Sequence, residues 1–309
     1  MINYSASAKS NKWLKEIGKD IHLYIMIAPV IAGFFIFSYL PMYGTLIAFQ
    51  DYDFIQGVFG SEWIGLKNFN ILIHDPYFYR IIKNTVLIGF YVLVWGFWPP
   101  ILLALLLNEI KIVRFKKWIQ TISYLPYFIA IVIVVGMLTD LLSSDGIINS
   151  LITAMGGEKI QFFSEPGWFR TIYVTSDVWQ TVGWGSIIYL AALTGVSPDL
   201  YESAVIDGAS RFQQAIHITI PSIMPIIRIM LIFAIANVFS VGFEKVYLMY
   251  NPSTYPTSDV IATYVYRRGI LGLDYSFGAA IGLLNSVIAF ILLMIANTTS
   301  RKISGDGLW

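Results

Sequence analysis

The chain has 309 residues, of which 57% are apolar and only 13% are charged, and its mean hydropathy is +0.68. A typical soluble domain is about 45–50% apolar and about 25% charged, so these values exclude a water-soluble globular domain and indicate a protein that contacts membrane lipid. The net charge of +1 argues against a nucleic-acid partner, and the absence of cysteine excludes disulfides and thiolate metal sites.

The first long apolar segment, residues 21–50, follows four lysines in residues 1–20. A signal peptide has an apolar region of about 7–15 residues before a cleavage site of small residues, and this segment is much longer. It is long enough to cross the membrane, since ~20 mostly apolar residues span the ~30 Å of hydrocarbon. We therefore predict a retained membrane span preceded by an N-terminal tail, residues 1–20.

Five further spans follow along the chain. They are residues 84–108, 118–139, 171–195, about 225–245, and 275 to about 297. The sequence thus predicts an all-α, polytopic membrane protein with six transmembrane helices in one domain, residues 21–297, and a C-terminal tail, residues 298–309. Adjacent prolines at 99 and 100 predict a kink in the second span, because neither can donate a helical hydrogen bond.

The distribution of Lys and Arg predicts the orientation. The side that holds both termini carries 11 Lys and Arg in 69 loop and tail residues, whereas the other side carries 7 in 96. Because cytoplasmic loops are enriched in these residues, both termini are predicted to be cytoplasmic.

No constellation for catalysis is visible. There is no phosphate-binding G-x-x-x-x-G-K-[ST] motif, and the three histidines, His22, His74 and His217, fall in separate segments. We therefore predict that the chain is not an enzyme and holds no catalytic residue, metal or cofactor of its own.

The loop between the fourth and fifth spans, residues 196–222, has strong helix signals. Ser197 is a favourable N-cap, Gly208 can end the first helix in a left-handed conformation, and Ser210 with Gln213 forms a capping box. These signals predict two short helices at an angle, neither long enough to cross a membrane.

Two interpretations of this loop remain open. The helices could rest on the lipid surface, or they could dock with a cytoplasmic protein. The loop is not basic, as an anionic lipid surface would favour. Small residues at Ala204 and Gly208 would let a partner approach closely. These features favour docking without deciding it.

The loop resembles the EAA motif of ABC importer permeases. That motif is Glu-Ala-Ala, three residues, Gly, nine residues, Ile-x-Leu-Pro, and the chain has Glu202-Ser203-Ala204, then Gly208, then Ile218-x-Ile220-Pro221. Ser203 and Ile220 depart from it conservatively. The chain also resembles the oligosaccharide and polysaccharide permeases of carbohydrate-uptake ABC importers over nearly its full length. The matching segments are Tyr39–Gly44, Ala48–Tyr52, Phe59–Phe69, Gln120–Pro126, Gly183–Ala192, Thr263–Gly269 and Gly307–Trp309.

This resemblance implies a type I ABC importer permease in the bacterial cytoplasmic membrane. Its partners would be a second, homologous permease, two cytoplasmic ATPase subunits that bind ATP and Mg²⁺, and an extracellular solute-binding lipoprotein. The substrate would be an oligosaccharide, for example an acidic one or a fragment of a plant or algal polysaccharide. The resemblance implies that Glu202 makes the main polar contact with the ATPase, that Ala204 packs there, that Gly208 sets the turn, and that Ser203 and Asp207 belong to the same contact.

Polar residues inside the spans suggest a substrate pathway. They are Asp177, Gln180 and Trp184, with Thr181, on one face of the fourth span, and Asn237, Ser240 and Glu244 on one face of the fifth. Carboxylates and amides bind sugar hydroxyls and indoles pack on pyranose rings, but polar side chains also join membrane helices to one another. The sequence leaves both interpretations open.

Arg267 and Arg268, in the last outer loop, could meet an acidic sugar or the binding protein, although an exposed basic pair is more often simply solvated.

Two other protein classes are alternatives to an importer permease. A stand-alone secondary transporter usually shows two repeated halves, and a membrane enzyme needs clustered acids, histidines or metal ligands, and neither feature is visible in the sequence.

Overall fold

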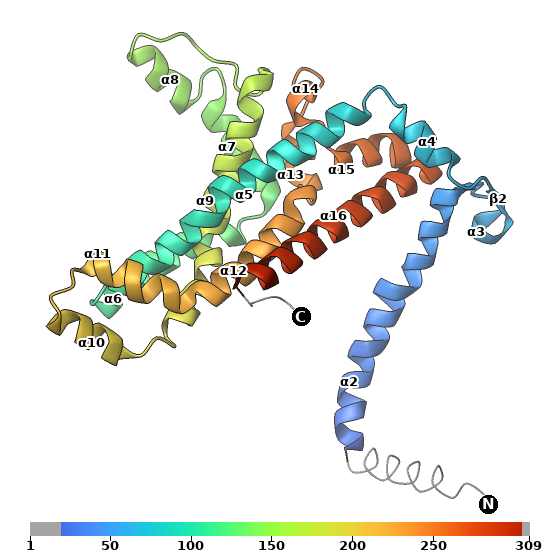
Figure 1. The fold of residues 1–309 in the computed structure, drawn as a ribbon. Helices are drawn as coiled ribbons and strands as arrows, with labels where there is room; N and C mark the ends of the chain where they lie inside the picture. The colour runs from blue at the N-terminus through green and yellow to red at the C-terminus, as the bar shows by residue number, and fades with distance from the viewer. Residues whose placement is uncertain (1–19, 305–309) are drawn as a thin grey trace, which may run out of the picture.

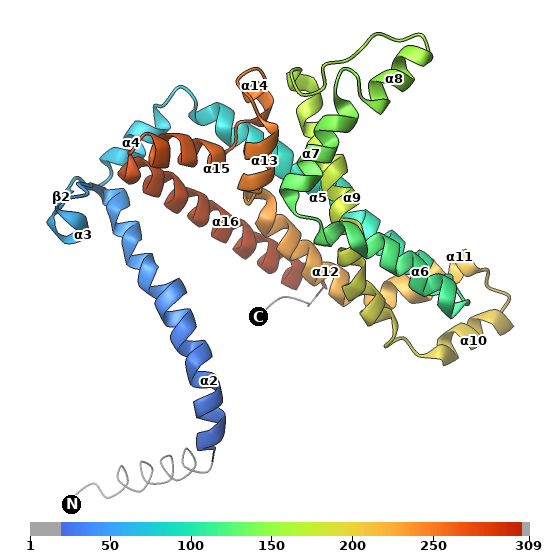
Figure 2. The ribbon, with the colours of Figure 1, turned by 180° about the vertical axis from the view of Figure 1, so that it is seen from behind.

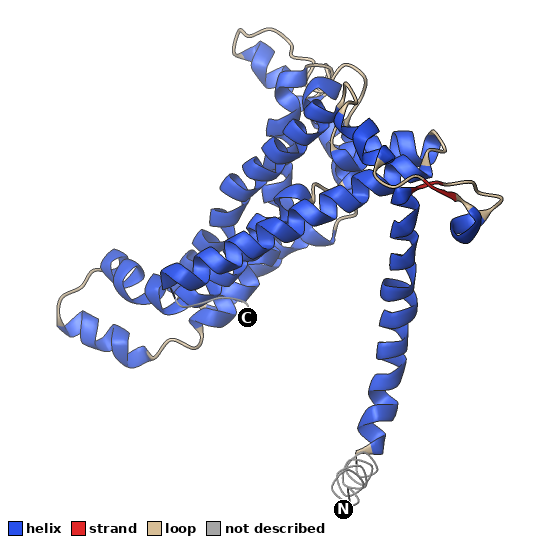
Figure 3. Ribbon diagram, turned by 45° about the vertical axis from the view of Figure 1, so that its right-hand side comes forward, coloured by secondary structure: helices blue, strands red, loops and turns tan. Residues whose placement is uncertain are grey.

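The computed structural model describes residues 20–304, which form an elongated assembly of helices (Figure 1). The strands in this part of the chain are β1 (Gln50–Asp51) and β2 (Glu62–Trp63), drawn red in Figure 3. They pair antiparallel, with Gln50 opposite Trp63 and Asp51 opposite Glu62. The all-α prediction is confirmed.

The first span stands apart from the other helices. It comprises α2 (Ile21–Phe34), the π-helical turn η1 (Phe35–Tyr39) and the 3₁₀ helix η2 (Leu40–Phe49). Its apolar window has none of its residues buried, and Figures 1 and 2 show α2 leaning away from the bundle. This first span meets the bundle at its C-terminal end, near the β-hairpin, α3 (Gly57–Gly60) and α4 (Lys67–Ile73).

Two long helices form the centre of the bundle. They are α5 (Phe78–Glu109) and α9 (Pro166–Leu193), which pack along one another. The structure continues α5 through Pro99 and Pro100 without interruption. Helix α9 crosses α6 (Val113–Tyr124) at Gly183, where a Cβ would lie 1.9 Å from the Ser123 carbonyl oxygen. Small residues permit this close approach.

The third span is not the single helix that we predict for residues 118–139. The structure has α6 (Val113–Tyr124), a 3₁₀ turn η3 (Leu125–Phe128) and α7 (Ile131–Leu142), followed by α8 (Ile147–Ala154). Pro126 lies in the turn, where its missing N–H and fixed φ favour a break in the helix. The segment therefore bends between α6 and α7.

The fifth span also differs from the prediction. Helix α12 (Ile220–Ala236) and the 3₁₀ turn η5 (Asn237–Phe239) end before Ser240, and α13 (Phe243–Met249) begins after Gly242. Three short helical segments follow, α14 (Tyr255–Ser258), α15 (Ile261–Tyr264) and η6 (Val265–Leu271). The prediction that residues 225–245 form one helix is therefore wrong.

The last helix, α16 (Tyr275–Ser304), continues beyond residue 297. The predicted C-terminal tail, residues 298–309, thus begins inside a helix. The Gly307–Trp309 segment and most of the predicted N-terminal tail, residues 1–20, lie outside the described residues. Within residues 20–304, five helical segments are long and apolar enough to cross a membrane: Ile21–Phe49, Phe78–Glu109, Ile131–Ala154, Arg211–Phe239 and Tyr275–Lys302. Helix α9 has sufficient length but is more polar, so a total of six spans stays a prediction.

Candidate coupling and translocation sites

The loop between α9 and α12 folds at its start as its sequence predicts. Helix α10 (Pro198–Ile206) begins after Ser197, whose hydroxyl accepts a hydrogen bond from the Asp199 N–H at 3.3 Å. It ends at Gly208, where φ is +79°, and the Ala209 N–H donates to the Ala204 carbonyl at 2.9 Å. A left-handed residue there reverses the chain, which glycine does without steric cost.

The second helix of the loop is longer than predicted. Helix α11 (Arg211–Gln214) begins with the predicted capping box, in which the Ser210 N–H donates to Gln213 Oε1 at 2.8 Å. It does not stop there, because the π-helical turn η4 (Ala215–Thr219) joins it to α12. A continuous helical segment, Arg211–Phe239, therefore begins in the loop and crosses the bundle.

Side-chain contacts fasten α10 to this long segment. The Tyr201 hydroxyl lies 3.1 Å from the Thr219 hydroxyl. The buried Gln214 side chain donates to the Ala209 carbonyl at 2.9 Å. A force applied to α10 would therefore act on the long helix through hydrogen bonds as well as through the chain.

The opposite face of the loop is exposed. Its apolar side chains include Leu200, Val205, Ile206 and Phe212, of which Ile206 is 86% exposed. The predicted contact residues Glu202, Ser203, Asp207 and Gly208 are exposed as well, and Ala204 is half-buried. Figure 1 shows α10 and α11 projecting from one end of the molecule. An exposed, mixed apolar and acidic knob of this kind suits a protein partner.

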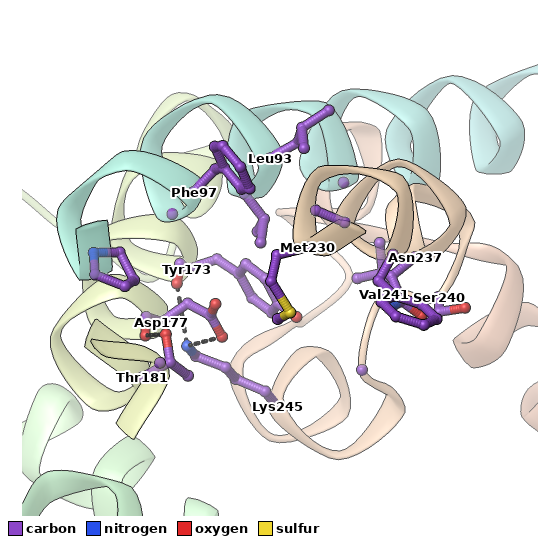
Figure 4. Close-up of a pocket in the computed structure, with 18 of the residues that line it drawn as sticks. Leu93, Phe97, Tyr173, Asp177, Thr181, Met230, Asn237, Ser240, Val241 and Lys245 are labelled. Carbon is purple, nitrogen blue, oxygen red and sulfur yellow. Dashed lines mark hydrogen bonds and ion pairs between the residues drawn. The ribbon is translucent and has the colours of Figure 1, made fainter. Parts of the chain in front are cut away.

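A cavity of about 770 Å³ lies among α5, α9, α12 and α13 (Figure 4). Apolar side chains such as Leu93, Phe97 and Met230 form much of its wall. Its polar side chains are Asp177, Thr181, Asn237, Ser240, Glu244 and Lys245. A cavity lined by apolar walls and a few convergent polar groups is the usual form of a small-molecule site.

Asp177 and Lys245 form an ion pair at the wall of this cavity. Lys245 Nζ lies 3.3 Å from Asp177 Oδ1 and donates to the Tyr173 carbonyl at 3.1 Å, and it also lies 4.7 Å from the centre of the Tyr173 ring. The Lys245 side chain is 5% exposed. A charge inside the membrane is costly unless paired, and this contact supplies the partner for each group.

Asn237, Ser240 and Glu244 reach the cavity from separate elements. Asn237 belongs to η5, Ser240 to the break after it, and Glu244 to α13. The prediction that they share one helix face is wrong, because the chain leaves the helical conformation between Ser240 and Gly242. The tertiary fold nevertheless brings all three side chains to the same cavity.

Gln180 and Trp184 do not line the cavity. Gln180 donates to the Ile129 carbonyl at 3.0 Å. The Trp184 ring stacks on Tyr127 with ring centres 4.7 Å apart and contacts Phe128. Both side chains thus pack α9 against the bend between α6 and α7. For these two residues the structure favours helix packing, and contact with sugar stays a prediction.

The two arginines near the end of the chain form ion pairs, and the prediction that they are simply solvated is wrong. Arg267 binds the buried Asp259 carboxylate through two nitrogens, at 2.8 and 3.1 Å, and Arg80 contacts it at 3.2 Å. Arg268 pairs with Asp75. The sequence offered no local sign of these pairs, because Arg80 and Asp259 are 179 positions apart.

Tyr264 completes the Asp75 pair. Burial raises the pKa of Tyr264 above its ordinary value, so its hydroxyl stays protonated and donates to Asp75 at 2.8 Å. In residues 20–304 no group of three His, Asp or Glu side chains could hold a metal ion.

Comparison with known proteins identifies the class. Residues 113–304 match the family described as binding-protein-dependent transport system inner membrane components. The chain belongs to this family: it is a multi-pass membrane permease, the transport subunit of an ABC importer.

Individual relatives are similar over nearly the whole chain. The polygalacturonan/rhamnogalacturonan transport system permease protein YteP of Bacillus subtilis (strain 168) is 43% identical over 97% of this chain and 94% of its own length. Protein LplB of the same organism is 40% identical over 98% and 96%. A crystal structure of a bacterial ABC transporter that imports the acidic polysaccharide alginate includes a chain that is 41% identical, with a TM-score of 0.87 over 95% of this chain and 99% of that one. A second structure of a bacterial alginate ABC transporter, in complex with a periplasmic protein bound to an alginate pentasaccharide, includes a chain with the same identity, TM-score and coverage.

Proposed function

We propose that the chain is the permease subunit of an importer for oligosaccharides, driven by separate ATPase subunits that dock on α10. The main support for this proposal is that the helical segment Arg211–Phe239 begins beside α10 and ends at the polar cavity, where Asn237 lies. A movement of α10 would therefore move residues that line the cavity. Coupling of two sites requires such a shared structural element.

The coupling residues follow from the exposed face of α10. Glu202 is solvent-exposed and free to meet a basic side chain of the ATPase, and Asp207 extends the acidic surface. The Ser203 hydroxyl donates to the Asp199 carbonyl at 2.9 Å, so this small side chain lies against its own helix. Ala204 is half-buried and small, so it does not prevent close approach of a partner. Gly208 sets the angle between α10 and α11.

A second, homologous permease would complete the membrane part of the importer. The first span, residues 21–49, is apolar, and although its C-terminal part η2 packs on α16, α2 leans away from the other helices. Its side chains, such as Phe37 at 81% exposure, are available to another subunit. The cavity is also only partly enclosed by α5, α9, α12 and α13, so the partner would supply the remaining wall.

The orientation follows from the same assignment. If ATPases bind α10, that end of the molecule is cytoplasmic. The start of α2 and the end of α16 lie on the same side as α10 in Figures 1 and 2, so both termini would face the cytoplasm of a bacterial cell. The opposite end, with α8 and α14, would face the extracellular solute-binding lipoprotein.

The substrate class is proposed from the relatives and from the cavity. YteP is named for the transport of polygalacturonan and rhamnogalacturonan, and the two solved transporters are named for alginate; all three are acidic polysaccharides. The cavity offers carboxylate, amide, hydroxyl and ammonium groups from Asp177, Asn237, Ser240, Glu244 and Lys245, which suit sugar hydroxyls. An oligosaccharide rich in uronic acids is therefore the first substrate to test.

Charge reversal on α10 tests the coupling. In the importer reconstituted with its partners, we expect Glu202→Arg to abolish most ATP-dependent uptake of labelled oligogalacturonide, because the acidic contact with the ATPase is replaced by repulsion. Asp20→Arg, at an exposed carboxylate directly before α2, lies on the same side of the molecule but far from α10 and should have little effect. Gly208→Pro should act like Glu202→Arg, because proline cannot adopt the positive φ.

The measurements are uptake, ATP hydrolysis and co-purification of the ATPase. Normal uptake by Glu202→Arg would contradict the proposal. Uptake by the permease alone in proteoliposomes, without ATP, would instead support a stand-alone secondary transporter.

A further inference from the structure

One face of α13 carries two aromatic side chains, and a third follows at the end of the helix. Phe243 and Tyr247 are four positions apart in α13, and Tyr250 is the residue directly after its last turn. The other side is buried in the bundle through Val246 and Met249, which are 0% and 2% exposed. The aromatic face is not buried, and Tyr247 is 40% exposed.

Two more rings extend this face from neighbouring elements. Tyr266 of η6 lies 5.0 Å from Phe243 and 5.2 Å from Tyr247, measured between ring centres. Tyr255 of α14 lies 5.1 Å from Tyr250. The ring centre of Tyr247 is 5.1 Å from that of Phe243 and 5.7 Å from that of Tyr250. We call these five contiguous rings the aromatic track.

The track joins two places that matter for transport. At one end Phe243 lines the cavity beside Glu244. At the other end Tyr255 belongs to α14, at the end of the molecule opposite α10 (Figure 1). Arg267, held by Asp259, lies 4.7 Å from the centre of the Tyr255 ring and fixes its position. The rings thus extend from the proposed outer end to the cavity.

The chemistry of the track suits sugar rings. A tyrosine presents a flat apolar face and a polar hydroxyl, so it can pack on the C–H face of a pyranose while binding its hydroxyl groups. Interfacial tyrosines that only anchor a protein in lipid lie around its perimeter at the headgroup level. Here the rings contact one another in a series and end at a cavity, which favours a ligand of repeated flat units.

We propose that the aromatic track binds the pyranose rings of an incoming oligosaccharide and leads them from the outer end into the cavity. This inference rests on the proposed function of the chain as an oligosaccharide permease. Tyr247 occupies the centre of the track and contacts three of its other rings, so it is the residue to test.

The test uses the complete importer in proteoliposomes and a tetragalacturonate probe. We expect Tyr247→Leu to reduce ATP-dependent uptake roughly fivefold, in line with the strength of single aromatic contacts. Tyr247→Phe keeps the ring and should retain most uptake. Tyr79→Leu, at a 75% exposed tyrosine in the first turn of α5, is the matched control and should have no effect. The loss for Tyr247→Leu should be smaller with digalacturonate, which engages fewer rings.

The outcomes separate this inference from the proposed function. Absence of ATP-dependent uptake by the unmodified importer would count against the proposed function. With an active importer, unchanged uptake by Tyr247→Leu would overturn the track. An equal loss of uptake with Tyr247→Phe would overturn it as well. Loss of the second permease from the purified Tyr247→Leu complex would also overturn it, because the aromatic face would then be a subunit contact.

Discussion

The Asp259 carboxylate is completely buried and accepts hydrogen bonds from Arg80, Arg267 and Thr263. Removing one partner of a buried charge is strongly destabilising, so Asp259 and its three donors form one interdependent cluster. Through this cluster the start of α5 is joined to the segment that holds α14, α15 and η6. The contact fixes the outer end of the aromatic track relative to the bundle.

Asp259→Ala should therefore destabilise the permease by about 3 kcal/mol, because two arginines lose their buried partner. Asp145→Ala is the matched control: Asp145 also binds a basic residue, Lys159, at 2.9 Å, but its side chain is 93% exposed. Solvent screens that pair, so little change is expected. Thermal unfolding of the detergent-solubilised protein measures both, and equal unfolding temperatures would contradict the assignment.

At the scale of elements, close helix contacts depend on glycine. The ideal Cβ position of Gly183 in α9 lies 1.9 Å from the Ser123 carbonyl oxygen, and that of Gly89 in α5 lies 1.9 Å from the Val238 carbonyl oxygen. These two contacts bring α6 to α9 and η5 to α5. They therefore set the positions of the elements on two sides of the cavity.

Gly183→Ala should force α6 away from α9 and lower stability by ~1–3 kcal/mol, as overpacking does. Gly136→Ala in α7 is the control, because a Cβ there meets nothing within 4 Å. Alanine is the better helix former, so this second variant should be neutral or slightly more stable. The yield of folded protein and its unfolding temperature are the readouts, and a harmless Gly183→Ala would show that the helices can separate at no cost.

At the scale of the whole molecule, the first span is the feature that a single chain leaves unexplained. The apolar window of this 29-residue span has no buried residue, and the contacts of the span with the bundle are chiefly those of η2 with α16. This exposure is explained if α2 packs on the second permease, since membrane helices associate through side-chain packing.

The absence of cysteine makes this contact directly testable. A photo-reactive group attached to Phe37→Cys would be the only thiol-linked probe in the chain, and we expect it to capture the second permease when the two are co-expressed. The same variant expressed without that partner is the control. Capture of lipid alone in the co-expressed complex would contradict the interface.

Features that depend on near neighbours along the chain could be predicted from the amino-acid sequence. Apolar segments predicted the helices, and the cap at Ser197, the left-handed turn at Gly208 and the capping box at Ser210 were all readable, because each involves residues two to five positions apart. The family resemblance, carried by the Glu202–Gly208 spacing, was readable for the same reason.

Contacts between residues far apart in the sequence became visible only in the three-dimensional structure. Arg268 pairs with Asp75 across 193 positions, Lys245 with Asp177 across 68, and the aromatic track joins three separate elements. The structure also shows that the third and fifth spans are interrupted helices. Of the polar residues of the fourth span, Asp177 and Thr181 line the cavity, whereas Gln180 and Trp184 pack between helices. Such contacts depend on how helices pack in three dimensions, and a pattern of local spacing carries no information about that packing.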